Sequence, residues 1–416
     1  MRDETSVGGG AIGGGSLASG FPRTTQWVSV GVILWCGLVA ALQLGKVAVF
    51  LPALGSEFRL GLAAQGWLMG IFALMGAFGG AFAGTMDSRF DVKHAILIGC
   101  LLLTVGSAAG SLATALTPLL TSRILEGAGF LTIGVAAPAL LQRLSAPKTR
   151  YLLLALWSTG VPVGMALVLL VGPAFHGWRE LWVSTAVLAA ISAMLVAFGV
   201  NRLPPLVRRP ESRGVLSDAR DTLTAGTPMM LALIFGSYSL QYFAVFSLVP
   251  IMLVRSMGVT IQFAGALAAP AVLVNALGNI VAGELMPRGV TARALIALGS
   301  LAMGVSGAAI FLVGGSPTVI VASCFVFSAT GGLIAGCIFA TAPIAAREPR
   351  LTPITVGLIV QGGSLGQVFG PVITGAVVQA FGWHAASAPI AIAAAIAGGL
   401  SMRLHGADGD PASAPT

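Results

Sequence analysis

The chain has 416 residues, of which 56% are hydrophobic and only 9% are charged. Soluble domains carry about 25% charged residues, so this composition excludes a water-soluble globular fold and indicates a membrane protein. The net charge of +8 does not indicate nucleic-acid binding, because the Lys and Arg residues lie between apolar runs, as they do in cytoplasmic loops.

A membrane-spanning helix needs about 20 apolar residues, and the sequence contains twelve such stretches. Residues 1–25 precede them and are rich in Gly and Ser, so we expect a flexible cytoplasmic tail there. In chain order the predicted spans are 27–53, 62–86, 95–115, 117–142, 151–173, 180–200, 228–253, 260–285, 292–314, 317–342, 353–379 and 385–403.

The positive charges predict the topology. With both termini in the cytoplasm, 17 of the 22 Lys and Arg residues lie on that side, in agreement with the positive-inside rule. Residues 201–227 form a polar segment with five arginines, which we interpret as a cytoplasmic linker. We therefore expect a multi-pass inner-membrane protein with helical bundles at 26–200 and 228–404 and a cytoplasmic tail at 405–416.

The two bundles show a weak internal repeat. The first span contains QLGKVAVFLP at 43–52, and the seventh contains QYFAVFSLVP at 241–250, 198 positions later. Gly160 and Gly164 of the fifth span recur as Gly362 and Gly366 of the eleventh, 202 positions later. A slowly drifting offset is typical of a duplicated unit with small loop insertions. The fold prediction is an all-α membrane protein with two pseudo-symmetric six-helix bundles.

The first span carries an unusual charge at Lys46, together with Gln43. A charge inside a membrane span is costly and is usually paired or functional. Three explanations remain open for Lys46: an internal partner such as Glu126, an anionic substrate, or a side chain that snorkels to the interface.

The fourth span contains Arg123-Ile-Leu-Glu126-Gly127-Ala-Gly129. Arg123 and Glu126 are three residues apart and share one helix face, where each lowers the cost of burying the other. The pair either is a structural neutralisation, at depth or at the interface, or lines a central cavity. In the second case Glu126, the one carboxylate placed away from the ends of a span, is the candidate proton carrier.

This motif resembles the Arg-x-x-Gln/Glu-Gly-x-Gly signature of the major facilitator superfamily. The loop after the second span, AGTMDSRFDVKHA, is similar in its charges to another motif of that family. The resemblance implies the two-bundle fold and a gating role for Asp87 and Arg89 at the cytoplasmic side; the alternative for Asp87 is a solvated loop carboxylate. The run WSTGVPVG followed by GWRELW resembles the cyanate-transporter-like branch of the family.

The seventh span places Tyr238 and Tyr242 on one helix face, on either side of Gln241. We expect these residues to line a cavity, with an interfacial aromatic belt as the alternative. Gln361 of the eleventh span is a further candidate for substrate binding, and the alternative is a hydrogen bond between helices.

The sequence contains no nucleotide-binding loop, catalytic-nucleophile motif or spacing of metal ligands, so we expect neither an enzyme nor a cofactor or metal. The predicted function is secondary active transport of a small anionic organic solute, coupled to protons or another ion, by alternating access. The predicted partners are the solute, the coupling ion and membrane lipid, and the chain is expected to be a monomer. Export of a metabolite, siderophore or drug, and a non-transporting membrane sensor, are the alternatives.

Overall fold

The computed structural model describes residues 23–83, 91–144, 147–200, 220–312, 316–348 and 351–404, and within these ranges all regular secondary structure is helical. The first half of the chain consists of α1 (Arg23–Glu57), α2 (Leu62–Gly70), η2 (Ile71–Ala73), α3 (Leu74–Ala83), α4 (Val92–Ser111), α5 (Leu116–Leu144), α6 (Pro147–Val171), η4 (Gly172–Ala174) and α7 (Trp178–Gly199). The second half consists of α9 (Gly226–Met257), α10 (Ile261–Leu285), η5 (Met286–Arg288), α11 (Ala292–Leu312), α12 (Pro317–Ala345), α13 (Thr352–Phe381), η7 (Trp383–Ala386) and α14 (Ser387–Ser401).

Each of the twelve predicted spans corresponds to a helix or to a run of helical segments. The second span is interrupted by the 3₁₀ turn η2, so that α2, η2 and α3 together cross the bundle. By length and composition, eleven helices of the described residues are apolar enough to cross a membrane, and a shorter apolar helix covers Thr159–Ala174. The fold prediction is therefore confirmed.

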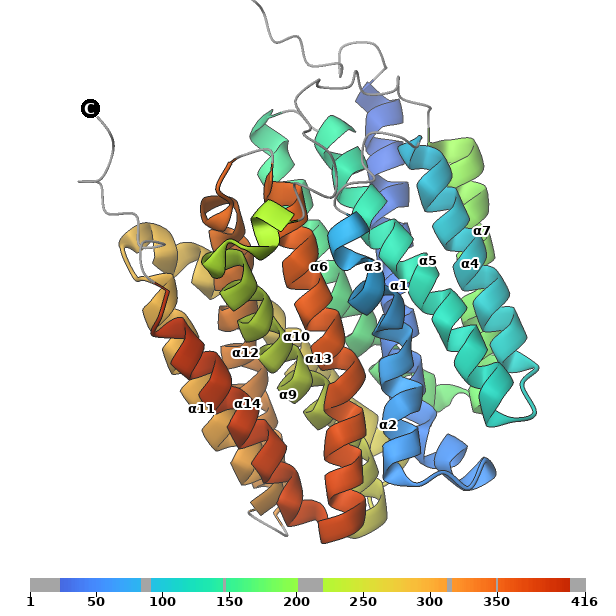
Figure 1. Ribbon diagram of the computed structural model, residues 1–416. Coiled ribbons are helices and arrows are strands. Elements are labelled where there is room, and N and C mark those ends of the chain that lie inside the picture. Colours follow the sequence, from blue (N-terminus) through green and yellow to red (C-terminus); the bar gives the residue numbers. More distant parts are fainter. Residues whose placement is uncertain are drawn as a thin grey trace, which may run out of the picture.

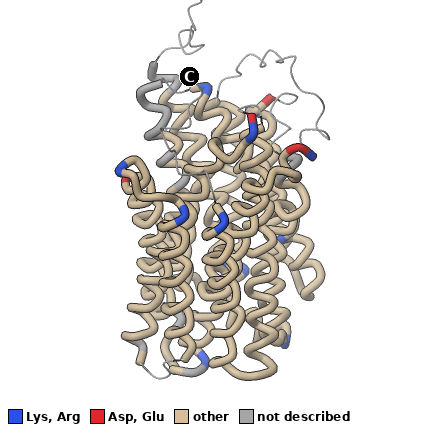
Figure 2. The backbone as a smooth tube through the Cα atoms, turned by 60° about the vertical axis from the view of Figure 1, so that its left-hand side comes forward, with Lys and Arg blue, Asp and Glu red and all other residues tan. Residues whose placement is uncertain are grey.

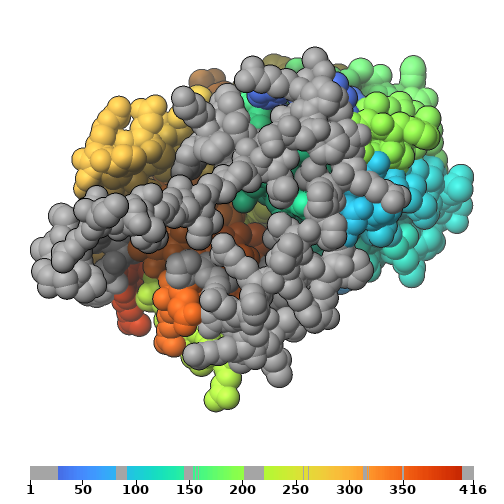
Figure 3. All heavy atoms as spheres, turned by 90° about the horizontal axis from the view of Figure 1, so that it is seen from above, coloured from blue at the N-terminus to red at the C-terminus, as the bar shows by residue number. Residues whose placement is uncertain are grey.

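The two halves lie side by side, with the first half on the right in Figure 1 and the second on the left. Viewed from above, the two halves again occupy opposite sides of the molecule (Figure 3). Helix α13 packs against α9 of its own half and against α2 and α3 of the other half, and α6 packs against α10. The halves therefore meet mainly where α13 packs on α2 and α3 and where α6 packs on α10.

Charged residues are sparse along the helices. Figure 2 shows long uncharged stretches through the bundle, with most of the charged positions in its upper part. Lipid tails present an apolar surface, and exposed apolar residues such as Phe198 and Phe381, 86% and 79% exposed, are suited to it. Apolar side chains therefore cover the bundle as well as filling it.

Glycines set how closely the helices approach. A Cβ atom on Gly127 of α5 would lie 1.9 Å from the Phe72 carbonyl oxygen of η2, and one on Gly332 of α12 would lie 2.0 Å from the Asn275 carbonyl oxygen of α10. A side chain at either position would overlap a backbone atom, so these helix pairs need glycine at the crossing.

The glycine contacts also show which positions of the two halves correspond to each other. A Cβ atom on Gly99 of α4 would meet the Ile133 side chain, 2.6 Å away, and one on Gly299 of α11 would meet Ile334, 2.8 Å away. Ile334 follows Ile133 by 201 positions, and Gly299 follows Gly99 by 200. The internal repeat is thus present in the packing, and α5 and α12 correspond with an offset of 201.

Candidate functional site

A charged cluster lies inside the first half, formed by Lys46 of α1 with Arg123 and Glu126 of α5. Lys46 and Glu126 are 0% exposed and Arg123 is 1% exposed. An ionised side chain at membrane depth is costly unless it is paired and hydrogen-bonded. The three groups bring two positive charges and one negative charge to a single enclosed position.

Lys46 donates hydrogen bonds to three different helices. Its Nζ atom lies 2.6 Å from Glu126 Oε1, 3.0 Å from Ser107 Oγ of α4 and 3.3 Å from Thr185 Oγ1 of α7. The ammonium group also lies 4.5 Å from the centre of the Trp182 ring, a cation–π distance. All three protons of the ammonium group therefore have acceptors, and of the three explanations for Lys46 the structure shows the internal partner.

Arg123 pairs with the second carboxylate oxygen of Glu126. One guanidinium nitrogen, NH1, pairs with Glu126 Oε2, and the other, NH2, donates to the Gln43 carbonyl oxygen at 3.0 Å. The guanidinium lies 4.5 Å from the centre of the Phe72 ring. Glu126 thus has a different cation at each of its two oxygens, as the three-residue spacing on one helix face allows.

Ser107 connects the cluster to Gln43. Its Oγ atom lies 2.9 Å from Glu126 Oε1 and 3.2 Å from Gln43 Oε1, and its single proton can be donated to either acceptor. Three buried donors around the cluster have no hydrogen-bond partner among the described residues: Gln43 Nε2, Arg123 Nε and Trp182 Nε1. The neighbourhood of the cluster therefore has more donors and more positive charge than the protein's own acceptors satisfy.

The equivalent position in the second half is apolar. The offset of 201 between α5 and α12 places Cys324 at the position of Arg123 and Phe327 at that of Glu126, and the 198-residue offset of the first repeat places Ala244 at that of Lys46. All three are buried. In agreement with this alignment, a Cβ atom on Gly106 would meet Glu126 at 2.8 Å, and one on Gly307 would meet Phe327 at 3.2 Å.

In the second half, the two tyrosines of α9 point into their own bundle. Their rings lie 5.6 Å apart, and the Tyr238 hydroxyl accepts a hydrogen bond from Asn275 Nδ2 of α10 at 3.1 Å. Tyr238 and Tyr242 are buried, which is unlike an interfacial aromatic belt. Gln241 donates to the Ser237 carbonyl oxygen on its own helix at 3.1 Å, and its Oε1 atom has no partner among the described residues.

The remaining sequence candidates lie apart from the cluster. Gln361 Nε2 of α13 donates to the Ala77 carbonyl oxygen of α3 at 2.8 Å, so this side chain bridges the two halves. Asp87 and Arg89, the predicted gating residues, lie outside the described residues. The structure therefore brings together Lys46, Arg123, Glu126 and Gln43, but not the second-half candidates with them.

Between the halves the structure shows a small crevice with no charged lining residue. Its walls come from α1, α6, η4, α9 and α10, and they are formed by Ala48, Val49, Pro52, Leu169, Pro173, Pro250, Val254, Ala264 and Gly265. The prolines of α1 and α9 correspond in the internal repeat and face this space from opposite halves. The charged cluster is enclosed inside the first half and does not open into this crevice.

Three residues that contact Lys46 were not predicted from the sequence: Ser107, Thr185 and Trp182. Hydroxyl and indole groups are common in membrane spans, so none of them differs in type or spacing from its neighbours. Only the packing of α4 and α7 around α1 shows that they contact Lys46. The available signal was indirect, because a buried ammonium group needs three acceptors and Glu126 alone cannot supply them all.

Two six-helix halves, joined by a polar segment and holding an enclosed charged cluster, define a multi-pass membrane protein of the two-bundle class. The sequence profile described as the Major Facilitator Superfamily matches residues 33–360. The chain belongs to this family.

The chain is also similar to individual members. Over 209 residues it is 28% identical to the arabinose-proton symporter of Escherichia coli (strain K12), a match that covers 48% of this chain and 43% of the symporter. Over 392 residues it is 26% identical to the 3-(3-hydroxy-phenyl)propionate transporter of the same strain, which covers 89% of this chain and 92% of that protein. The matches to sugar symporters thus span less than half of those relatives.

Among solved structures, a bacterial homologue of the human lysosomal transporter Spinster, in an inward-facing and unoccupied conformation, has the same fold. The TM-score is 0.75 at 19% identity, and the alignment covers 93% of this chain and 96% of the homologue. The relationship to the cyanate-transporter-like branch is not supported by these similarities. Of the glycines behind that prediction, Gly164 stands at a helix crossing, with Ala41 2.5 Å from its Cβ position, and Gly177 directly precedes α7, so packing and a helix start account for these two.

Proposed function

We propose that this protein is a secondary active transporter that moves a small organic anion together with protons, by alternating movement of its two halves. Lys46 and Arg123 attract the anion, and Glu126 carries the proton. Members of the family supply the precedent for transport, because the relatives include proton symporters for arabinose and galactose.

The observation that carries the proposal is the charged cluster and its apolar counterpart. The same scaffold is built twice, and in the second half Ala244, Cys324 and Phe327 fill the equivalent positions. Replacing a buried ion pair by well-packed apolar residues is often neutral or stabilising. The fold therefore does not need these charges, which supports a functional reason for their presence in the first half.

The relatives represent two substrate classes, sugars and an aromatic carboxylate. The relative matched over nearly the whole chain is named for an aromatic carboxylate, whereas the relatives named for sugars match about half of it. A cluster with one excess positive charge favours an anion over a neutral sugar. Binding a sugar needs many free hydrogen-bonding groups, while Asn275, Tyr238 and Gln361 are bonded within the protein. We therefore favour the carboxylate.

Uptake into proteoliposomes tests the proposal. We expect an inwardly directed proton gradient to drive uptake of radiolabelled 3-(3-hydroxyphenyl)propionate above the rate of protein-free liposomes. Lys46→Met should remove most of this uptake, and Cys324→Ala, at the position equivalent to Arg123, should retain it. Gradient-driven uptake of arabinose but not of the carboxylate would overturn the substrate class. Uptake unaffected by the gradient would overturn proton coupling.

We further propose that the protein resides in the bacterial inner membrane with both termini in the cytoplasm. The excess of Lys and Arg in the loops of one side supports this orientation. The upper end in Figure 1 is then the cytoplasmic end.

A further inference from the structure

The charged cluster is incomplete as a hydrogen-bonded unit. When Lys46, Arg123 and Glu126 are all ionised, the cluster carries one excess positive charge. Arg123 Nε and Gln43 Nε2 are buried donors without a partner among the described residues, and both residues already contact the cluster. Buried polar groups in proteins are almost always satisfied. The excess positive charge and the free donors thus indicate that a negatively charged hydrogen-bond acceptor is missing beside Glu126.

A carboxylate fits this requirement. Planar guanidinium and amide groups donate well to a carboxylate, which accepts through two oxygens. While Glu126 stays ionised, one bound carboxylate would offset the excess positive charge. Its two oxygens would be acceptors for the free donors of Gln43 and Arg123, two residues that the hydrogen bond from Arg123 NH2 to the Gln43 carbonyl oxygen holds together. Because Gln43 and Arg123 are 0% and 1% exposed, the anion reaches them only when α1 and α5 separate, and the structure shows the subsite closed.

The position of Glu126 determines how such an anion affects the proton. Glu126 is surrounded by Lys46 of α1, Arg123 of α5 and Ser107 of α4. The aromatic rings of Phe72 and Trp182 lie against the two cations. Among the described residues, no further ionisable side chain is bonded to these three charged groups. A second anion would therefore repel the Glu126 carboxylate at short range and draw away the cations that stabilise it.

Repulsion between the bound carboxylate and the carboxylate of Glu126 favours a proton on Glu126, because protonation removes one of the two negative charges. When Glu126 is neutral, both cations are free to hold the substrate, and Ser107 can turn its proton from Glu126 to Gln43, 3.2 Å away. Thermodynamic linkage makes this effect reciprocal, so that anion binding favours protonation and protonation favours anion binding.

On the basis of the proposed function, we propose that Arg123 Nε, Gln43 Nε2 and the Lys46 ammonium form a carboxylate subsite beside Glu126. We further infer that the anion and one proton bind together and cross in the same direction. The pair carries no net charge, and the empty and the fully loaded cluster both carry one excess positive charge. Transport is then electroneutral symport, and exchange of the anion against a proton is excluded.

Proton uptake on ligand binding tests the inference directly. Purified protein in weakly buffered detergent is mixed with benzoate, and a pH indicator records the protons exchanged; benzamide, of the same shape without the charge, is the matched control. We expect benzoate to cause uptake of up to one proton per bound anion, and benzamide to cause none. Over the pH range in which binding takes up a proton, the affinity for benzoate should fall as the pH rises, by up to about tenfold per pH unit.

Variants separate the roles of the residues. Glu126→Gln should bind benzoate without proton uptake and with an affinity independent of pH, while Gln43→Leu should weaken binding several-fold with all charges intact. Ser306→Ala, on α11 of the second half, should behave as the unaltered protein. If Glu126→Gln does not fold, the pH dependence of the unaltered protein and Gln43→Leu still decide the matter.

Failure of this inference and failure of the proposed function give different experimental results. Proton release on binding, or binding without any proton exchange, would overturn the inference while leaving gradient-driven uptake in proteoliposomes to support the proposed function. A protein that neither binds benzoate nor shows gradient-driven uptake of any carboxylate would overturn both.

Discussion

Two buried cations, Lys46 and Arg123, share the carboxylate of Glu126. Removing one member of this cluster therefore lowers stability by an amount that depends on which member is removed. Loss of Lys46 leaves Arg123 and Glu126 as a neutral pair, whereas loss of the Glu126 charge leaves two cations enclosed at close range. Removing one partner of a buried ion pair is strongly destabilising because the other charge stays uncompensated. The cluster therefore depends most on its single carboxylate.

We predict that Glu126→Gln lowers stability more than Lys46→Met does. The expected loss is about 3–5 kcal/mol for the glutamine variant, and less for the methionine variant, which keeps a balanced pair and an apolar stem. Thermal unfolding in detergent measures both. Greater loss in Lys46→Met would show that the ammonium hydrogen bonds to Ser107 and Thr185, and not charge balance, dominate the cluster.

The sequence was informative about the members of the cluster that are rare in membrane spans. Lys46, Arg123 and Glu126 could be predicted because a charge among apolar residues requires an explanation. Their hydrogen-bond partners could not, because Ser107 and Thr185 are ordinary residues in such helices. Which of them reaches Lys46 depends on how α4 and α7 pack around α1, and no local pattern contains that information.

At the scale of elements, α13 has a central place, since it contacts α9 on one side and α2 and α3 on the other. Cβ atoms on Gly362, Gly366 and Gly370 would lie 2.1–2.3 Å from carbonyl oxygens of α9. Helix α13 thus fits closely onto α9, and the two are suited to move as one body. Toward the first half, the hydrogen bond from Gln361 to Ala77 joins the same helix to α3.

We predict that Gly366→Ala disrupts the α9–α13 pair, because the new methyl group would lie 2.1 Å from the Gly236 carbonyl oxygen. Overpacking of this kind typically costs about 1–3 kcal/mol. Gly283→Ala is the matched control, since nothing lies within 4 Å of its Cβ position, and alanine favours helix by about 1 kcal/mol. Thermal unfolding should separate the two, and equal melting temperatures would contradict the close fit.

The helices themselves were largely predictable from apolar length, because the bilayer imposes about 20 residues per span. Their ends were less so: α1 continues to Glu57 beyond the predicted end at 53. There Glu57 accepts a hydrogen bond from Trp178 Nε1 at 2.7 Å and pairs with Arg179 at 2.8 Å. Contacts with α7 thus support a last turn that apolar length alone does not predict.

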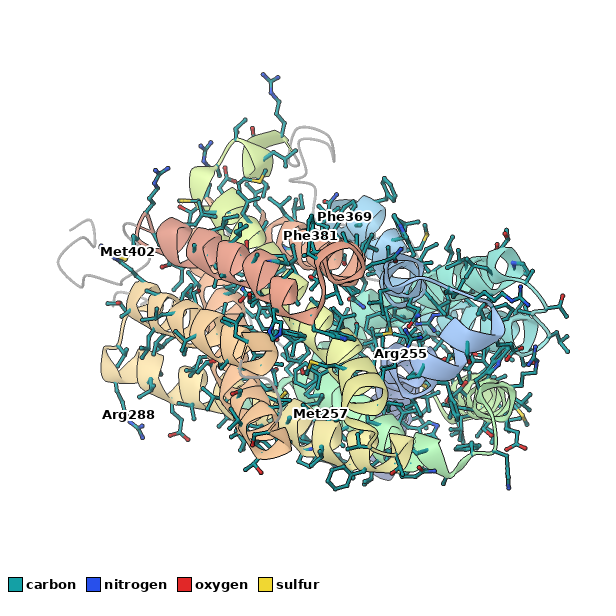
Figure 4. All side chains as sticks on the ribbon, turned by 90° about the horizontal axis from the view of Figure 1, so that it is seen from below. Arg255, Met257, Arg288, Phe369, Phe381 and Met402 are labelled. Carbon is teal, nitrogen blue, oxygen red and sulfur yellow. The ribbon has the colours of Figure 1, made fainter. Side chains whose placement is uncertain are left out.

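For the whole molecule, the distribution of charge predicts which end faces the cytoplasm. In Figure 4, viewed from below, Arg255 lies toward the middle of the molecule at the end of α9, while Arg288 projects at the rim of the second half. The positive-inside rule places Arg288 in the cytoplasm and Arg255 outside. The four native cysteines are all buried, so the protein offers little background for thiol labelling.

We predict that a membrane-impermeant maleimide labels Arg255→Cys in intact cells and labels Arg288→Cys only after the cells are permeabilised. The unaltered protein is the control and should remain unlabelled under both conditions. The reverse pattern would place the termini outside and would contradict the proposed orientation.

The central claim is that Lys46, Arg123 and Glu126, whose equivalents in the second half are uncharged, couple proton and solute movement. Proton-gradient-driven uptake of 3-(3-hydroxyphenyl)propionate into proteoliposomes, compared between Glu126→Gln and Phe327→Leu, tests this claim most directly. The account predicts that the first variant loses gradient-driven accumulation, while the second, at the equivalent position of the other half, retains most of it. Equal accumulation in both variants would contradict the account.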